Sequence, residues 1–362
     1  MIKQFNIKMM AMLLVFFVAS CQKEKNNDNE GTYIESGSAI VVNEGAFGSN
    51  NGSISFISAE GVVKNNIFEL ANNGSPLGDV VQSFARVGNK GLICVNNSQK
   101  IEVVDVKTFQ RLATINAGDT TNYPRYAVAV ASNKAFITNG SGDGIVAVLN
   151  LDNYSITKTI PVGDGPEQME IASGNVYVCN SGGWGIDSTV SVINIGSETV
   201  TKTIKVGDIP TKIIRDAQEN LWVLCNGQTD FSAWPIVKNL TPAKLVRINT
   251  STQTVDRVFT LIEANGNTQK LNIAIGNNGT SVYYAIDNDV YRLGIDATGL
   301  PSNKLFTTSG IYGLGASYNQ QIWVLQAPSF SSSGKVVKYS NTGTAIDSVS
   351  VGIGPNGVVF NP

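Results

Sequence analysis

The stretch that decides the fold is residues 176–210, VYVCNSGGWGIDSTVSVINIGSETVTKTIKVGDIP. It holds three short runs, VYVCN, VSVIN and VTKTI, which are separated by polar turns and followed by a Val-Gly-x-x-Pro turn. Such β-branched and aromatic runs, bounded by Gly, Asn, Asp or Pro, are typical of strands. The preceding residues 135–166 repeat the same order and end in VGDGP. A repeat of about 40 residues built only of short strands predicts a β-propeller blade.

Seven copies of this repeat follow one another. Their first apolar runs begin near Ala39, Leu92, Ala135, Val176, Leu221, Val282 and Ile322. One blade alone cannot bury both of its faces, whereas seven blades in a ring bury each sheet against its neighbours. The sequence therefore predicts an all-β, seven-bladed β-propeller with no second domain, although 362 residues is more than one ordinary core supports.

The phase of the repeat predicts how the ring closes. The first predicted strand ends at Asn43, and the closing segment 354–360 matches the strand that follows the Val-Gly-x-x-Pro turn in other copies. We expect that strand to be the innermost one of each blade. The last strand of the chain would then complete the blade begun at the N-terminus and close the ring.

The N-terminus is typical of an exported protein. Residues 1–20 begin with Lys3 and Lys8 and continue with an apolar stretch that is too short to span a membrane, which predicts a signal peptide. The sequence VASC at 18–21 resembles a bacterial lipobox and implies cleavage before Cys21 and lipidation of that residue. The alternative is an ordinary signal peptide with an incidental cysteine.

Three segments follow from this interpretation: a signal peptide at 1–20, a lipidated Cys with a flexible tether at 21–37, and the propeller at 38–362. The tether is polar and poor in apolar residues. Several acyl chains on one residue anchor a protein firmly. We therefore expect an outer-membrane lipoprotein of the cell envelope, exposed at the surface and touching the membrane only through its anchor.

Composition excludes several classes of function. The chain has no histidine, which excludes Ser-His-Asp and Cys-His catalysis and His-ligated zinc. With 26 basic and 28 acidic residues it lacks the basic stripe of a nucleic-acid binder. We expect a monomer without enzymatic activity, cofactor or metal.

The positions of the cysteines and aspartates argue against a metal site. Cys94, Cys179 and Cys225 lie near the end of the same strand in different blades, too far apart for a disulfide or a shared metal, so three buried free thiols are predicted. Asp119, Asp164 and Asp208 recur in turns of three different blades, which spreads them around the ring.

Two sets of loops should meet at one end of the channel. They are the connections after the Asn-ended strand and the connections into the innermost strand. Variable loops on a regular scaffold are typical of a binding face. The candidate ligand-binding residues in these two sets are Phe47, Tyr123, Arg125, Glu167, Trp184, Phe231, Trp234, Tyr312 and Phe330, with Lys212 beside them.

Aromatic residues in polar loops are the unusual feature of this face. Trp184 stands between two glycines, where no strand pattern requires it. Exposed aromatic rings often contact flat ligands or sugars. The alternative is that each ring fills the gap between its blade and the next. Trp222 and Trp323 lie inside predicted strands and are expected to pack in the core.

The blade pattern resembles YVTN-type propellers, with VYVCN at 176–180 and VIN at 192–194 as the nearest match. The opening VNEGAFGSNNGSI at 42–54 is similar to propeller lipoproteins of gut Bacteroidota, some of which bind corrinoids at the cell surface. The resemblance implies capture of a cobalamin-like corrinoid for a TonB-dependent outer-membrane transporter. Two alternatives stay open: a scaffold that binds glycans or proteins, and a lactonase-like propeller enzyme.

Overall fold

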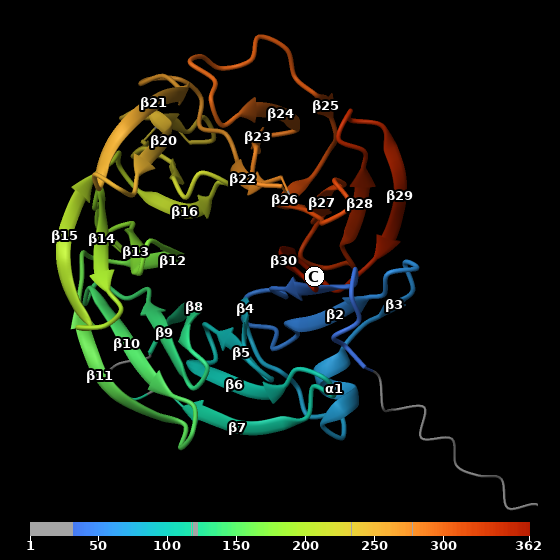
Figure 1. The fold of residues 1–362 in the computed structure, drawn as a ribbon. Helices are drawn as coiled ribbons and strands as arrows, with labels where there is room; N and C mark the ends of the chain where they lie inside the picture. Colours follow the sequence, from blue (N-terminus) through green and yellow to red (C-terminus); the bar gives the residue numbers. More distant parts are fainter. Residues whose placement is uncertain (1–31, 117, 119–121, 233, 277) are drawn as a thin grey trace, which may run out of the picture.

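The computed structural model describes residues 32–362 except 117, 119–121, 233 and 277. Within these residues, seven four-stranded antiparallel sheets are arranged around a central channel (Figure 1). The predicted all-β, seven-bladed propeller is therefore confirmed. Figure 1 also places the strand that follows each outer-to-inner connection next to the channel, as the repeat phase predicted.

The four strands of each blade lie in order from the channel to the outside of the ring. Blade 1 contains β30 (Pro355–Phe360), β1 (Ala39–Asn43), β2 (Ser53–Ile57) and β3 (Val63–Lys64). Blade 2 contains β4 (Val81–Val87), β5 (Lys90–Val95), β6 (Lys100–Asp105) and β7 (Arg111–Asn116). Blade 3 contains β8 (Pro124–Ala131), β9 (Lys134–Asn139), β10 (Ile145–Asn150) and β11 (Ser155–Pro161). Blade 4 contains β12 (Pro166–Ala172), β13 (Asn175–Asn180), β14 (Thr189–Asn194) and β15 (Thr199–Lys205).

The remaining three blades follow the same order. Blade 5 contains β16 (Pro210–Arg215), β17 (Leu221–Cys225), β20 (Ala243–Asn249) and β21 (Thr254–Ile262). Blade 6 contains β22 (Leu271–Ile275), β23 (Ser281–Ile286), β24 (Asp289–Gly294) and β25 (Phe306–Thr307). Blade 7 contains β26 (Ile311–Ala316), β27 (Ile322–Gln326), β28 (Lys335–Tyr339) and β29 (Ala345–Ser350).

Two insertions depart from the simple blade. A two-stranded ribbon, β18 (Thr229–Asp230) with β19 (Lys238–Asn239), lies in the long loop of blade 5. A helix, α1 (Ile67–Ala71), lies in the connection from blade 1 to blade 2 and buries Ile67 and Phe68. The sequence did not predict this helix, because five residues are too few to show a helical period.

The core is divided among the seven interfaces between neighbouring blades. Successive side chains of a strand point to opposite faces of its sheet. In β1, Ile40 and Val42 pack against blade 2, while Ala39 and Val41 pack against blade 7. The buried apolar residues of the described chain form seven such clusters. Both faces of the inner strands of each blade must therefore be apolar, which explains the near-continuous apolar runs in the sequence.

The ring closes as the sequence predicted. β30 pairs antiparallel with β1, from Ala39 opposite Phe360 to Asn43 opposite Pro355. The last blade also approaches this strand closely: a side chain at Gly315 would have no room beside Val358, and one at Gly313 would stand 2.8 Å from the Asn356 carbonyl oxygen. The first and last parts of the chain thus share one sheet and its neighbouring interface.

The three cysteines of the described residues, Cys94, Cys179 and Cys225, are buried free thiols, as predicted. Burial in an apolar environment raises the pKa of the Cys94 thiol to about 12 and also raises that of Cys179. Inert, protonated thiols of this kind are part of the core packing.

The first described residues contact turns on one face of the propeller. The Tyr33 amide donates to the Lys107 carbonyl in the turn between β6 and β7, and the Gly37 amide donates to the Asn361 carbonyl after β30. The predicted signal peptide, Cys21 and most of the predicted tether lie outside the described residues. No helix in the part of the chain that the structure describes is long and apolar enough to cross a membrane.

Candidate functional site

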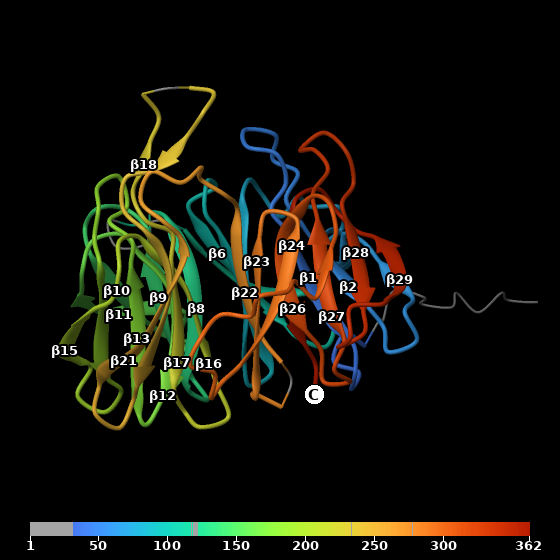
Figure 2. The ribbon, with the colours of Figure 1, turned by 90° about the horizontal axis from the view of Figure 1, so that it is seen from above.

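The two predicted loop sets lie at one end of the channel. Adjacent strands of each blade run antiparallel, so the connection from the second to the third strand and the connection from an outer strand to the next inner strand share one end. We call this end the loop face. Figure 2 shows the ribbon at β18 projecting from the same side as the blue loop after β1 and the red loop after β27. The chain enters at the opposite end.

The loop aromatics are strongly exposed. The exposed fractions are 81% for Phe47, 91% for Trp184, 62% for Phe231, 74% for Trp234 and 45% for Phe330. A ring that is mostly in solvent fills no gap between blades, so that alternative is wrong for the first four. Phe330 is intermediate, because its ring packs edge-on against Tyr312 with centroids 5.4 Å apart.

Not all predicted residues come together. Arg125 and Tyr312 line one cavity at the channel end, and Glu167 is held by Arg125. Tyr123 is half-buried, and its amide donates to Asn139 Oδ1 at 2.7 Å, which fixes the connection into β8. The exposed loop rings stand around this cavity on the same face of the propeller and do not line it.

The mouth cavity, as we name the hollow at the loop-face end of the channel, has a volume of about 470 Å³. Most of its lining residues have polar side chains, and most of them lie at the starts of the inner strands. On one side, the Tyr312 hydroxyl donates to the Glu44 carboxylate. Asn272 Nδ2 donates to the Tyr312 carbonyl at 3.2 Å, and the Lys212 ammonium donates to Asn272 Oδ1.

The other side of the mouth cavity is organised by Arg125. Its guanidinium meets the Glu167 carboxylate through two parallel contacts, Nε to Oε2 at 3.0 Å and Nη2 to Oε1 at 2.9 Å. Nη1 donates to Gln82 Oε1 at 2.8 Å, and Gln82 Nε2 donates to the Tyr126 hydroxyl at 3.1 Å. This bidentate geometry fixes the orientation of the planar guanidinium group.

Several side chains of the mouth point into the channel because a β-bulge lies near the start of their strand. In six of the seven inner strands, pairing with the second strand is interrupted by one extra residue near the start of the inner strand, and only β22 keeps a regular register. A bulge leaves the added residue unpaired and re-aims its side chain. Gln82, Arg125, Glu167, Tyr312 and Asn356 all occupy these added positions.

The sequence reasoning therefore missed part of the wall. Gln82, Tyr126, Asn272 and Asn356 line the mouth cavity and were not predicted. The available signal was the position directly after the proline that opens an inner strand, as in Pro124-Arg125 and Pro355-Asn356. An alignment of the seven repeats on this second residue of the inner strand would have identified Gln82, Asn272 and Asn356 as candidates.

Burial sets the electrostatics of the mouth. Desolvation by burial raises the pKa of Glu44 and of Glu167, although Arg125 opposes both shifts. Burial also raises the pKa of Tyr126 to about 12 and lowers that of Lys212 to about 8. Every one of these shifts reflects the cost of holding a charge away from water.

These carboxyl groups predict an acid shift in stability. Burial raises the pKa of Glu44, Glu69, Glu167 and Glu170 in the folded protein. The folded state then binds more protons than the unfolded state above pH about 4.3, so stability is lost as pH rises through the folded pKa values. We expect the thermal unfolding midpoint to be higher near pH 5.5 than near pH 7.5.

The control for this prediction is the variant Glu44→Gln/Glu167→Gln/Glu170→Gln, in which the difference between the two pH values should shrink. An unfolding midpoint in the unmodified protein that rises from pH 5.5 to pH 7.5 would contradict the prediction.

Below the mouth, the channel continues as the shaft cavity, with a volume of about 310 Å³. Gln82, Tyr126, Lys212 and Asn356 line both cavities. Farther along, apolar side chains join the wall. They include Phe84, Ile214, Ile273, Ile275, Leu314 and Val358. The shaft cavity thus adds apolar side chains to the polar groups that it shares with the mouth.

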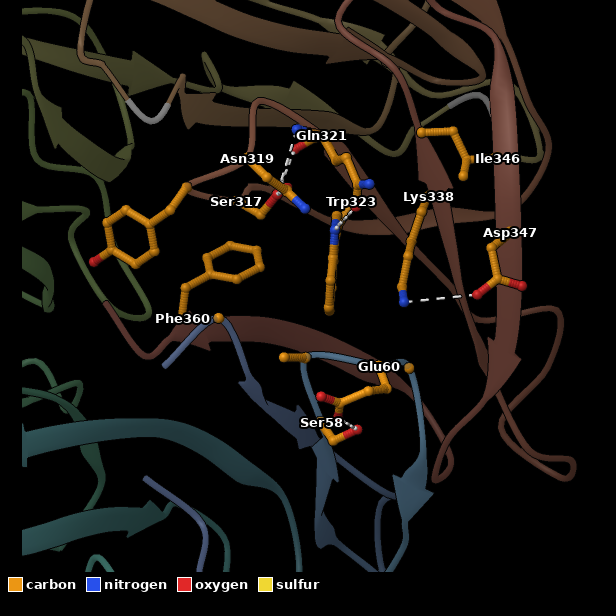
Figure 3. A pocket seen from close by; sticks show the side chains of 14 residues that line it. Ser58, Glu60, Ser317, Asn319, Gln321, Trp323, Lys338, Ile346, Asp347 and Phe360 are labelled. Atoms are coloured by element: carbon orange, nitrogen blue, oxygen red, sulfur yellow. Dashed lines mark hydrogen bonds and ion pairs between the residues drawn. The ribbon is translucent and has the colours of Figure 1, made fainter. Parts of the chain in front are cut away.

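A separate groove of about 360 Å³ lies at the end of the propeller opposite the loop face, between the turn after β2 and the last blade. Figure 3 shows Lys338 between the Trp323 ring and Asp347. The ammonium lies 4.9 Å from the ring centroid and 3.6 Å from the carboxylate. Trp323 is buried, as predicted for a strand residue, and its ring packs edge-on against Phe360. The buried cation of this groove therefore already has its counter-charge.

The fold and the channel define a class of protein: a seven-bladed β-propeller with a polar channel mouth beneath exposed aromatic loops. The chain belongs to the family described as "Domain of unknown function (DUF5074)", whose model matches residues 37–354. No curated protein matches the sequence.

Two solved structures share the fold at low sequence identity. One is a quinonprotein alcohol dehydrogenase-like protein from Bacteroides thetaiotaomicron VPI-5482, with 15% identity and a TM-score of 0.66, covering 90% of this chain and 79% of that one. The other is the Kuenenia stuttgartiensis hydrazine synthase, with 14% identity and a TM-score of 0.54, covering 78% of this chain and 92% of that one. At such identity, the similarity shows the fold alone.

Proposed function

We propose that this propeller is a non-catalytic ligand-binding lipoprotein of the cell envelope, which captures a corrinoid at its loop face and passes it to a TonB-dependent outer-membrane transporter. The observation that carries the proposal is the set of exposed aromatic rings around a polar cavity on one face. Rigid aromatic side chains give large contact areas at little cost in conformational entropy.

The chemistry of the loop face suits a large, flat ligand with an amide fringe. Rings such as Trp184 and Trp234 can stack on a planar macrocycle. The amides of Gln82, Asn272 and Asn356 offer donors and acceptors for peripheral amide groups. Arg125 and Glu167 form an ion pair with each other, so these two charged groups are suited to position a ligand and not to exchange protons with it.

The point of chain entry supports tethered capture. Tyr33 and Gly37 join the propeller at the end opposite the loop face. A lipid on Cys21, joined through the proposed tether, would leave the loop face open to a ligand and to a transporter. Surface exposure and the transporter partner remain part of the proposal.

Titration of the purified protein with cobalamin and with cobinamide tests the proposal. We expect a change in the corrinoid absorption spectrum and saturable heat of binding. Trp184→Ala and Trp234→Ala should each weaken binding by about two- to tenfold, because one aromatic contact contributes about 0.5–1.5 kcal/mol.

Tyr318→Ala is the matched control. Tyr318 is 53% exposed and lies in the turn between β26 and β27, at the end opposite the loop face, so its removal should leave corrinoid affinity unchanged. Absence of any spectral or thermal change with both corrinoids would contradict the corrinoid proposal. Equal losses in all three variants would contradict the assignment to the loop face.

A further inference from the structure

Lys212 is a half-buried cation of the channel that has no carboxylate partner among the described residues. It lies on β16, where the mouth cavity meets the shaft cavity, and lines both. Its ammonium donates to Asn272 Oδ1, a neutral amide oxygen. No carboxylate of the residues that the structure describes lies within 4.0 Å of the ammonium nitrogen.

Three other cations of low exposure have a counter-charge. Arg125 is paired with Glu167 at 2.9 Å, Arg247 with Asp256 at 2.6 Å, and Lys338 with Asp347 at 3.6 Å. A buried cation without a partner is costly, because its hydration is lost and no attraction offsets the loss. Lys212 has no such partner. Lys90 and Arg257, which also have no carboxylate partner, donate to backbone carbonyls, whereas Lys212 lines an open cavity.

The neighbouring charges leave this cavity positive. The mouth wall contains the cations Arg125, Lys212 and Lys270, the anion Glu44, and the phenols Tyr126 and Tyr312. The Glu44 carboxylate accepts the Tyr312 hydroxyl, and the Glu167 carboxylate is held by Arg125. Each of these carboxylates thus has a donor other than Lys212, and burial lowers the pKa of the Lys212 ammonium to about 8. An anion in the cavity would find an uncompensated positive charge.

The shaft adds a second requirement. Directly beyond Lys212, the wall is formed by aliphatic and aromatic side chains such as Ile214, Ile273, Leu314 and Val358. A hydrated inorganic anion gains nothing from this wall. An aliphatic chain does gain, because burial of apolar surface is favourable.

We infer that the channel binds an aliphatic monocarboxylate, with its carboxylate on Lys212 and its chain in the shaft cavity. The donors for the carboxylate are the Lys212 ammonium and Gln82 Nε2, which has a second hydrogen besides the one donated to the Tyr126 hydroxyl. This site lies below the exposed aromatic rings, and the inference holds whether or not a corrinoid binds at the loop face.

Isothermal titration of the full mature chain with butyrate, hexanoate and octanoate at pH 7 tests the inference. Affinity should rise by up to about fourfold for each added methylene group that enters the shaft. Hexylamine and hexanol, which have the same chain without the negative charge, should bind at least tenfold more weakly than hexanoate.

Variants at the lysine test its role. Lys212→Met should lower hexanoate affinity more than tenfold, whereas Lys212→Arg, which keeps the charge, should retain most of it. Lys335→Met, which removes an exposed cation of β28, is the matched control and should change nothing. Since Lys212→Met replaces a half-buried cation that has no carboxylate partner with an apolar side chain of similar length, the variant is expected to fold.

The pH dependence provides an independent readout. Affinity for hexanoate should fall as pH rises from 7 to 9.5, because the free protein loses the Lys212 proton in that range. In Lys212→Arg, this fall should disappear. Equal binding of hexanol and hexanoate, butyrate binding as tightly as octanoate, or unchanged affinity in Lys212→Met would each overturn the inference. The cobalamin titration tests binding at the loop face, so failure of one proposal can be told apart from failure of the other.

Discussion

Deleting residues 355–362 is expected to abolish cooperative folding of the propeller. The deletion removes β30, which pairs with β1 along its whole length and forms the channel wall of blade 1. It also removes Asn361, whose amide donates to the Tyr33 carbonyl at 3.0 Å and to Ser38 Oγ at 2.8 Å. Without β30, the edge of β1 is open to the channel and blade 7 loses its inner neighbour.

The expected loss is comparable with the whole stability of the protein. Native domains are stable by only about 5–15 kcal/mol, and losing an entire strand with two packed faces removes a large part of that. Thermal unfolding followed by circular dichroism should change from one sharp transition to a broad or absent one. Addition of a synthetic peptide of residues 355–362 in excess should restore the transition.

Deletion of Pro362 alone is the control, because this residue is exposed and follows the last bonded residue, Asn361. It should leave the unfolding midpoint unchanged. If the chain without 355–362 unfolds as sharply and at the same temperature as the full chain, closure by β30 does not hold the ring together.

The success of the fold prediction has a physical reason. A propeller repeats one local pattern, and each interface between blades needs apolar residues on both faces of the inner strands, as Ile40 and Val41 show in β1. Seven copies of that requirement produce a signal that no single strand carries. The phase of the repeat also predicted the pairing of β30 with β1, because the closing segment matched the strand that follows each Val-Gly-x-x-Pro turn.

The candidate site was less accessible to sequence reasoning, because it depends on backbone register. Arg125 and Glu167 were predicted from their position after a turn, but the bulge that points Gln82 and Asn356 into the same channel has no residue signature of its own. The exposed loop rings could be predicted because aromatic residues are unusual in polar loops. The mouth cavity is instead lined by polar residues that look like ordinary strand residues in the sequence.

Arg125→Met is expected to have the second large effect. The change leaves the Glu167 carboxylate without the guanidinium that holds both of its oxygens, in a position where its side chain is only 13% exposed. Removing one partner of a buried ion pair costs about 3–5 kcal/mol. We expect the low end, about 3 kcal/mol, because the Arg125 side chain is 27% exposed. Urea unfolding at pH 7 measures this loss.

Glu167→Gln in the Arg125→Met background should recover most of the stability, because a neutral amide in the same place carries no unpaired charge. The loss in Arg125→Met alone should also be smaller at pH 5, because without Arg125 nothing opposes the effect of burial, which raises the pKa of Glu167 and favours its neutral form. Arg215→Met is the matched control: its partner Glu219 is 51% exposed, and the change should cost less than about 0.5 kcal/mol. Equal losses for Arg125→Met and Arg215→Met at pH 7 would show that the charge pair beside the mouth is as weak as a surface pair, and that the polar wall does not depend on it.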